Sequence, residues 1–290
     1  MAADMLLMAT PQLDILTIRR SKRVKHYSHI FHSIADIGIY ARYAFDYFDS
    51  ILCAGVYQKK NILEFEKRRE SPSKLLLETG YTPFDYLSEV KKNTLEKSND
   101  KITILVAPTW SSNSLLTLFE MKILEPLLTG KYNIILRPHP QMFVSQKDLI
   151  AKIKKKTENN PHLIWDTAPS GAKSMEDSDI MLSDVSGIII EYSFIYKKPV
   201  ITIDTPVITT GLEADDMDIN DIWEVAVRDS LGKLVDEKEI NNLPDIIDNV
   251  LSEFNAYDID RIIDENIYNF KNAGTAAAQQ LIQISEDLKK

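Results

Sequence analysis

An arginine and a histidine lie two residues apart in the segment RPHP, residues 137–140, directly after the mainly apolar run YNIIL. Such a run is typical of a strand that is covered on both faces, and the prolines beside the histidine prevent it from continuing as strand or helix. Arg137 and His139 are therefore predicted to be held stiffly at the carboxyl end of a strand. A guanidinium there supports negative charge, and an imidazole suits proton transfer near neutrality.

Two more predicted strands end in polar residues. The segment VAPTW ends in Thr109 and Trp110, and MLSDVSG carries Ser183, Asp184, Ser186 and Gly187. In doubly wound sheets ligands bind beyond the carboxyl ends of the strands. Each polar set taken alone is better explained as a cap or a turn, but the three together favour a binding site.

The segment SDVSG also predicts the start of a helix. Ser186 and Gly187 open this helix, whose first backbone N–H groups are free to bind an anion such as a pyrophosphate. The serine hydroxyl adds a donor. Glu191 lies on the same helix and is predicted either to accept hydrogen bonds from ribose hydroxyls or to be an ordinary exposed carboxylate.

Five basic residues crowd into one short segment near the start of the chain, followed by three histidines: Arg19, Arg20, Lys22, Arg23 and Lys25, then His26, His29 and His32. A solvated charged turn that leads into a strand is the simpler interpretation of such a run. The alternative is a contact surface for phosphate-rich ligands or anionic lipid.

Short apolar segments alternate with amphipathic ones along the chain. Strands are predicted first in DMLLMAT, VKHYSHIFH, SILCAGV and KLLLETG, with helices around Ile39 to Phe48 and Gln58 to Arg69. After a charged break at residues 90–101, strands are predicted in ITILVAPTW, YNIILRPHP, HLIWDTA, DIMLSD, PVITID and WEVAVRD. This alternation predicts an α/β fold with parallel sheets. The break separates predicted domains 1–92 and 93–290, and the second includes the final helix, AGTAAAQQLIQISEDLKK.

The composition is that of a soluble globular protein: 290 residues, 44% apolar and 27% charged. The single cysteine, Cys53, excludes a disulfide framework and fits a reducing compartment, so a cytoplasmic location is expected. Neither a transmembrane helix nor a signal peptide is predicted, because no apolar run is long enough and no positive stretch precedes the first one. The net charge of -9 disfavours nonspecific nucleic-acid binding.

Two other clusters have simpler structural explanations. The acidic segment GLEADDMDINDIWE lacks the spacing and glycine of a calcium loop, so capping and solvation are preferred to metal binding. Aromatic residues in the predicted first helix are assigned to core packing rather than to base stacking: Tyr40, Tyr43, Phe45, Tyr47 and Phe48.

The ordered set VAPTW, RPHPQ, SDVSG with Glu191, and KKPVITID resembles the CDP-glycerol glycerophosphotransferase family, whose members act in teichoic acid and capsular polymer biosynthesis. The resemblance runs through most of residues 25–275. It implies a GT-B-like architecture, with two Rossmann-like domains and the nucleotide held mainly by the C-terminal one. It also implies an N-terminal domain nearly twice as long as residues 1–92, so that domain is abbreviated here or the chain begins partway through it.

By position in these motifs, the resemblance implies a role for each matching residue. His139 lies at the pyrophosphate and Arg137 supports its charge, Ser186 and Gly187 hold phosphate, and Glu191 binds the ribose. The family's His-Gly motif aligns best with His32 and Ser33, which makes His32 the candidate base and His29 the next choice. The sequence departs from the family at Gly187, where a second serine is usual, and at Ser111, where a basic residue is usual.

The predicted activity is transfer of glycerol phosphate, or a related polyol phosphate, from a CDP-linked donor to a hydroxyl of a cell-surface polymer or its lipid-linked precursor. No cofactor and no metal are expected. The basic segment Arg19–Lys25 is predicted to guide the anionic acceptor or to contact the inner membrane face. Two alternatives remain open: a glycosyltransferase or epimerase that uses UDP-sugars, and a silent or truncated nucleotide-binding subunit.

Overall fold

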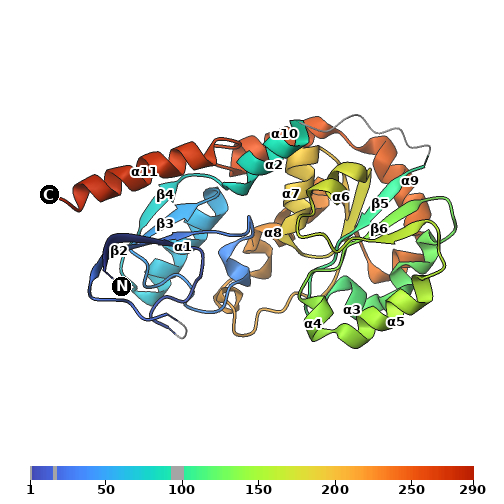
Figure 1. Ribbon diagram of the computed structural model, residues 1–290, viewed down its shortest axis with the longest axis horizontal. Helices are drawn as coiled ribbons and strands as arrows, with labels where there is room; N and C mark the ends of the chain where they lie inside the picture. Colours follow the sequence, from blue (N-terminus) through green and yellow to red (C-terminus); the bar gives the residue numbers. More distant parts are fainter. Residues whose placement is uncertain (1, 16–17, 93–100) are drawn as a thin grey trace. The chain divides into compact units, whose positions relative to one another are not determined.

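The computed structural model describes residues 2–15, 18–92 and 101–290 (Figure 1). They form two compact units, each with its own parallel sheet. The first unit comprises Met1–Glu89, Thr209–Trp223 and Arg261–Lys290, and the second comprises Val90–Ile208 and Glu224–Asp260. The predicted boundary in residues 90–101 falls largely outside the described residues. Among the described helices, none is both long and apolar enough to cross a membrane.

The sheet of the first unit has four parallel strands in the order β1-β2-β3-β4. They are β1 Ala3–Met8, β2 Val24–Ile30, β3 Ser50–Cys53 and β4 Leu75–Glu78, and all four were predicted from the sequence. Three helices lie wholly or mostly in this unit: α1 Val56–Arg69, α2 Pro83–Lys92 and α11 Ala273–Asp287, with the 3-10 helices η1 Ile37–Ile39, η4 Glu213–Asp216 and η5 Ile219–Asp221. The second half of α10 Ala256–Asn266 and the first residue of α8 Trp223–Val227 also belong to it. Helix α1 buries Ile62 and Phe65 against the sheet.

The helix predicted around Ile39 to Phe48 is wrong. Only η1 forms, and the backbone at Tyr43 is left-handed, with φ of 64°. Phe45 and Phe48 are buried in the core of the first unit. Burial of aromatic rings therefore determines the conformation of this segment and outweighs its helical periodicity. Tyr43 and Tyr47, which were also assigned to packing, are 40% and 47% exposed.

The sheet of the second unit has six parallel strands in the order β10-β9-β8-β5-β6-β7. They are β5 Thr103–Val106, β6 Asn133–Leu136, β7 Leu163–Trp165, β8 Ile180–Ser183, β9 Val200–Ile203 and β10 Gly232–Val235. The helices are α3 Leu115–Phe119, α4 Met142–Ser145, α5 Lys147–Thr157, α6 Ala172–Asp177, α7 Gly187–Tyr196, α8 Trp223–Val227, α9 Leu243–Glu253 and α10 Ala256–Asn266, with η2 Glu120–Ile123, η3 Glu125–Leu127, η6 Arg228–Leu231 and η7 Glu237–Asn242. All four residues of β5 are buried, as expected for a strand covered on both faces, and its Ile104 and Val106 belong to one core cluster.

The strand predicted in WEVAVRD is also wrong, because these residues form α8 and the start of η6. Trp223 at the start of α8 stacks on Tyr57, with ring centroids 4.0 Å apart, and Val225 and Val227 are buried. The sixth strand begins later, at Gly232. A Cβ atom at Gly232 would lie 2.2 Å from the carbonyl oxygen of Val200 on β9, so this strand pair requires a glycine there.

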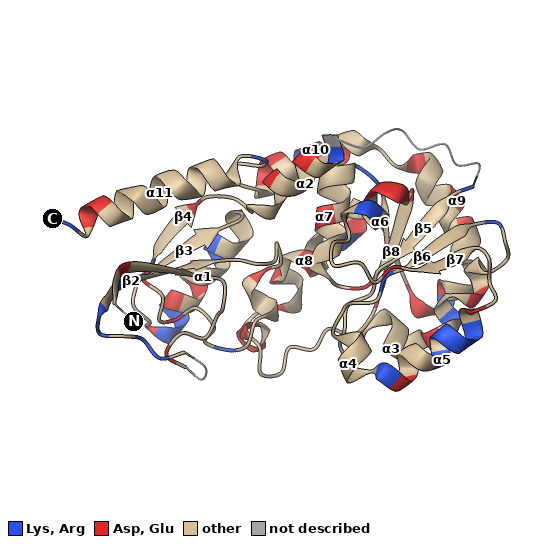
Figure 2. Cartoon of the chain, in the orientation of Figure 1, with Lys and Arg blue, Asp and Glu red and all other residues tan. Residues whose placement is uncertain are grey.

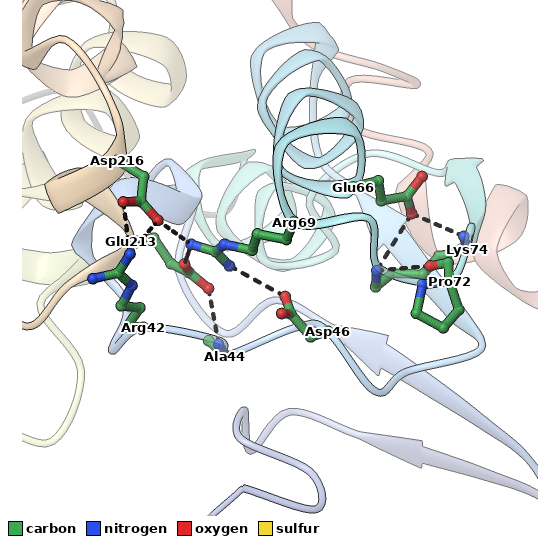
Figure 3. Close-up of polar contacts among 9 residues, drawn as sticks. All are labelled: Arg42, Ala44, Asp46, Glu66, Arg69, Pro72, Lys74, Glu213 and Asp216. Atoms are coloured by element: carbon green, nitrogen blue, oxygen red, sulfur yellow. Dashed lines mark hydrogen bonds and ion pairs between the residues drawn. The ribbon is translucent and has the colours of Figure 1, made fainter.

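The segment Thr209–Trp223 belongs to the first unit, where ion pairs hold it (Figure 3). Arg69 contacts Glu213 at 2.5 Å, Asp216 at 3.1 Å and Asp46 at 3.2 Å, and Arg42 contacts Asp216 at 2.7 Å. Glu213 is fully buried and also accepts a hydrogen bond from the backbone N–H of Ala44 at 2.8 Å. The acidic segment thus supplies carboxylates to a structural ion network.

The C-terminal segment Arg261–Lys290 also belongs to the first unit, which differs from the predicted domain 93–290. Ala277 and Ile284 of α11 are buried in a cluster with Leu52 of β3 and Leu77 of β4. In addition, the carboxylate of Asp85 accepts hydrogen bonds from the first backbone N–H groups of α11. The apolar face of α11 is therefore covered by the first sheet, which the prediction of a continuous second domain missed.

Candidate active site

The predicted site residues of the second unit gather at one edge of its sheet. Thr109 follows β5, His139 follows β6, and Ser186 follows β8. Because β8, β5 and β6 are neighbouring parallel strands, their carboxyl ends lie together. Hydrogen bonds and ring contacts then show which residues build this edge and which remain available to a ligand.

Ser183 and Asp184 are fully buried at the end of β8, and both bind the loop after β5. The hydroxyl of Ser183 donates to the carbonyl of Ala107 at 2.6 Å. The backbone N–H groups of Thr109 and Leu115 donate to the two carboxylate oxygens of Asp184, at 2.8 and 2.7 Å. Both side chains were predicted to bind the nucleotide, but their contacts make them positioning residues for the loop between β5 and α3.

Burial raises the pKa of Asp184 to about 6 from an ordinary value of 3.8, although the backbone hydrogen bonds favour the charged form. Between about pH 4 and pH 6 the folded protein therefore binds more protons than the unfolded chain, and its stability falls as pH rises. We expect Asp184→Asn to remove this pH dependence of the free energy of unfolding. Its size is about 3 kcal/mol, because each pKa unit corresponds to about 1.4 kcal/mol.

The measurement is the free energy of unfolding by urea from pH 4 to pH 7. The wild-type value minus the Asp184→Asn value should decrease across that range, and the exposed Asp245→Asn variant is the control for the loss of one carboxylate. A level difference for Asp184→Asn would show that its carboxyl group is charged throughout.

His139 is exposed at the edge and is held from two sides. The ring of Trp110 stacks on the imidazole, with centroids 6.1 Å apart and an interplanar angle of 30°. The backbone N–H of Gln141 donates to Nδ1 of His139 at 3.1 Å. Partial burial lowers the pKa of the imidazole below its usual value of 6.5. His139 is consequently neutral near pH 7.

Arg137 is already paired within the protein. Its guanidinium contacts Asp166, the residue after β7, at 2.6 Å, and its side chain is 12% exposed. Burial favours the neutral acid of Asp166, but hydrogen bonds from Ser174, from the backbone N–H of Ala168 and from Arg137 hold its pKa below the ordinary value. Arg137 therefore reaches the edge as half of an ion pair, not as an isolated cation.

The first turn of α7 offers donors to an anion. Ser186 is the N-cap residue of this ten-residue helix, and its hydroxyl makes no capping hydrogen bond. Gly187 follows as the first helical residue, and the backbone N–H of Ile189 donates to the carbonyl of Ser186 at 3.2 Å. Glu191 lies half-buried one turn further along. The start of a helix can bind a phosphate group through its backbone N–H groups, and this role of Ser186 and Gly187 stays a prediction.

A cavity of about 260 Å³ lies beside Arg137, between the chain segments that follow β6 and β7. It is lined by Arg137, Pro138, Pro140, Phe143, Asp166, Thr167 and Ala168. Rings and methyl groups form most of its wall, with one ion pair at its side. This lining suits a flat ligand group with an apolar face and a polar rim.

The first unit has its own polar edge, where the loop after β2 carries His32 exposed to solvent. The backbone of this loop is anchored: Tyr81 donates to the carbonyl of His32 at 3.1 Å, Tyr57 to that of Ile34 at 2.5 Å, and Gln58 to that of Ala35 at 2.9 Å. The structure therefore holds the His32 backbone stiffly while the imidazole stays accessible.

His29, the second choice for the base, has no access to a substrate. It is fully buried on β2, and its ring contacts Phe31, Phe45 and Phe48 at centroid distances of 4.9 to 5.0 Å. Burial lowers the pKa of His29 to about 3. Neither ring nitrogen has a hydrogen-bond partner among the described residues. His29 is a neutral core residue.

The basic segment before β2 divides into structural and exposed members. Arg20 pairs with Asp49 and lies over the ring of Tyr27, which makes it part of the fold. Lys25 pairs with Asp4 at 2.8 Å on the surface. Three further basic residues of this segment are exposed: Arg19, Lys22 and Arg23.

Two residues of the edge were missed from the sequence. Trp110 was noted at the end of VAPTW but was not assigned to the site, although it contacts His139. Asp166 ends the segment HLIWD, and the same rule that selected Arg137, a polar residue at the end of a buried strand, would have selected it. The pairing of Asp166 with Arg137 changes the expected charge of the site.

The model of the family CDP-Glycerol:Poly(glycerophosphate) glycerophosphotransferase matches residues 54–205, about half of the chain. None of the curated proteins matches the sequence significantly.

Solved structures resemble the whole described fold. The wall teichoic acid polymerase TagF is 18% identical, with a TM-score of 0.60, and the match covers 99% of this chain and 73% of TagF. A TagF variant soaked with CDPG for 30 minutes is 17% identical, with a TM-score of 0.61 and coverage of 99% and 72%. UDP-GlcNAc 2-epimerase from Neisseria meningitidis, bound to UDP-GlcNAc, is 16% identical, with a TM-score of 0.57 and coverage of 89% and 70%. These matches confirm the predicted GT-B-like fold.

Proposed function

Because the chain belongs to the CDP-glycerol:poly(glycerophosphate) glycerophosphotransferase family, we propose that it transfers glycerol phosphate from a CDP-linked donor to a hydroxyl of an anionic cell-surface polymer or its lipid-linked precursor. The observation that carries this proposal is the carboxyl edge of the second sheet. There the uncapped first turn of α7, His139 and a cavity of about 260 Å³ supply donors for a diphosphate and room for a base.

The donor is assigned to the second unit. Ser186 and the first N–H groups of α7 hold the diphosphate, His139 donates a hydrogen bond to it, and Glu191 accepts from the ribose hydroxyls. The cavity between Pro140 and Thr167 takes the cytosine, whose flat face matches the apolar wall and whose amino group matches the Asp166 side. The donor is a substrate in this reaction, and we assign no resident cofactor.

The proposed chemistry needs positioning and charge stabilisation rather than a covalent nucleophile. An acceptor hydroxyl attacks the β-phosphorus of the donor, a new P–O bond forms, and the P–O bond to CMP breaks. CMP leaves with the bridging oxygen. We assign the proton of the acceptor hydroxyl to His32, the exposed imidazole on the anchored loop of the first unit.

The test is calorimetric titration with CDP-glycerol, CDP-ribitol, CMP and UDP-N-acetylglucosamine, followed by a transfer assay that measures released CMP. We expect selective binding of the cytidine compounds and weaker binding by Ser186→Ala, by about threefold to tenfold for one lost hydrogen bond. Ser112→Ala, at an exposed serine, is the control. Selective binding of the UDP-sugar would replace the proposal with a sugar-nucleotide enzyme, and binding without turnover would indicate a silent subunit.

We also propose that the exposed members of the basic segment meet the anionic acceptor where it is anchored at the inner membrane surface. The support for this proposal is charge complementarity in a protein of net charge -9. Each basic residue near an anionic lipid surface contributes about 1 kcal/mol. The triple variant Arg19→Gln, Lys22→Gln and Arg23→Gln should therefore bind phosphatidylglycerol vesicles at least tenfold more weakly than the wild type.

The matched control removes three exposed charges from α5 of the second unit, with Lys147→Gln, Lys155→Gln and Lys156→Gln (Figure 2). Co-sedimentation with vesicles at two salt concentrations separates the variants. Equal losses in both triple variants would show that only net charge matters, and this would refute a specific membrane role for the basic segment.

A further inference from the structure

The contacts of His139 define where its proton lies. The backbone N–H of Gln141 points at Nδ1, with a nitrogen–nitrogen distance of 3.1 Å. A backbone N–H can only donate, so Nδ1 must offer its lone pair. In a neutral imidazole the proton is then on Nε2. Protonation of Nδ1 would place two N–H groups against each other.

The ring is also fixed in orientation. Trp110 stacks on it at an interplanar angle of 30°, and the histidine is flanked by Pro138 and Pro140, which restrict its backbone. Trp110 in turn follows Thr109, whose backbone N–H is held by the buried carboxylate of Asp184. A chain of contacts therefore runs from the end of β8 through the loop after β5 to the imidazole after β6.

Trp110 lies at the surface of this edge rather than in the core. It is 47% exposed, so burial alone does not fix its place. Its partner in the fold is the His139 ring. The neighbouring cation, Arg137, is paired with Asp166, so its guanidinium is not an isolated positive charge next to the histidine.

We propose that Trp110 is a positioning residue that, together with the backbone N–H of Gln141, holds His139 as a neutral imidazole with its proton on Nε2, so that it serves the donor diphosphate as a hydrogen-bond donor rather than as a cation. The identity of the ligand in this inference rests on the proposed function, whereas the tautomer of the His139 ring does not depend on it. Stacking fixes the plane of the ring, and the N–H of Gln141 fixes the tautomer. The diphosphate is then met by oriented dipoles, which are the first turn of α7 and this imidazole.

The first arm of the test needs no ligand. Ring ¹⁵N chemical shifts of the full chain, with His139 assigned by comparison with His139→Gln, report the tautomer directly. At pH 7 we expect the Nε2–H form, with Nδ1 unprotonated. In Trp110→Ala the ring should lose this single state and show averaged shifts, whereas Trp110→Phe, which keeps an aromatic face, should retain it.

The second arm measures transfer. Trp110→Ala should lower kcat/KM for CDP-glycerol by about threefold to tenfold, as expected for loss of one aromatic contact. Trp110→Phe should recover most of that loss, and Tyr257→Ala, which removes a more exposed aromatic ring from the same unit, should have no effect.

Three results would overturn the inference: a protonated Nδ1 at pH 7 in the wild type, an unchanged ring spectrum in Trp110→Ala, or equal loss of kcat/KM in the Phe and Ala variants. Failure of the proposed function gives a different result. In that case the wild type would bind no CDP compound, while the ¹⁵N measurement would still decide how His139 is held.

Discussion

Replacing His139 by alanine is expected to lower kcat for CDP-glycerol-dependent transfer by about 10²- to 10³-fold, the usual effect of removing one donor that faces developing negative charge. The negative charge in this reaction builds on the departing CMP and on the transferred phosphoryl group. The affinity for CMP should change much less, because CMP lacks the β-phosphate. The measurement is kcat from CMP release, paired with CMP binding by calorimetry.

His162→Ala is the matched control, since His162 is a partly buried histidine of the same unit that lies just before β7 rather than at its carboxyl end. It should leave both quantities unchanged. Circular dichroism checks that the His139 variant is folded. Unchanged turnover in folded His139→Ala protein would remove this residue from the mechanism.

The second large effect is expected at His32. Its loss should reduce kcat by about 10²- to 10⁴-fold, the range for a general base, because the acceptor hydroxyl would have to lose its proton to water. Donor binding should be unaffected, since the donor is assigned to the second unit. His32→Asn keeps a side chain of similar size. Its rate of glycerol phosphate transfer to the acceptor hydroxyl should recover partly at high pH, where hydroxide can remove the proton instead.

His26→Asn provides the comparison, because His26 is a partly buried neighbour on β2 that hydrogen bonds to Ser50 at 2.9 Å. It tests whether any histidine change in this region disturbs the first unit. If both variants lose turnover equally, or if His32→Asn retains full activity, the base must be sought elsewhere.

The ends of the strands could be predicted from the sequence, but the roles of the residues at those ends could not. The runs before Thr109, Arg137 and Ser183 are strands as predicted, since uniformly apolar segments between turn residues fit a parallel sheet. A polar residue after such a strand can face the ligand or face inward, and its type does not distinguish the two. Asp184 faces inward and binds two backbone N–H groups.

Other features lie beyond what local patterns contain. Arg69 and Glu213 are 144 residues apart in sequence, and each alone is an ordinary charged residue of a helix and a turn. Nothing local indicates that they pair. Likewise, WEVAVRD has residues typical of strands, but it forms a helix whose first residue, Trp223, stacks on Tyr57. Tertiary contacts of this kind outweigh a weak local propensity.

The return of α11 to the first sheet has a consequence for how the protein is made. Its Ala277 and Ile284 fill a cluster with Leu52 and Leu77, residues synthesised some 200 positions earlier. During translation at about 5–20 residues per second, the apolar surface around β3 and β4 stays uncovered for about ten seconds or more before α11 is synthesised. The first unit should thus complete its folding only after synthesis of α11, and nascent chains stalled before Arg261 should depend on chaperones and be sensitive to proteases.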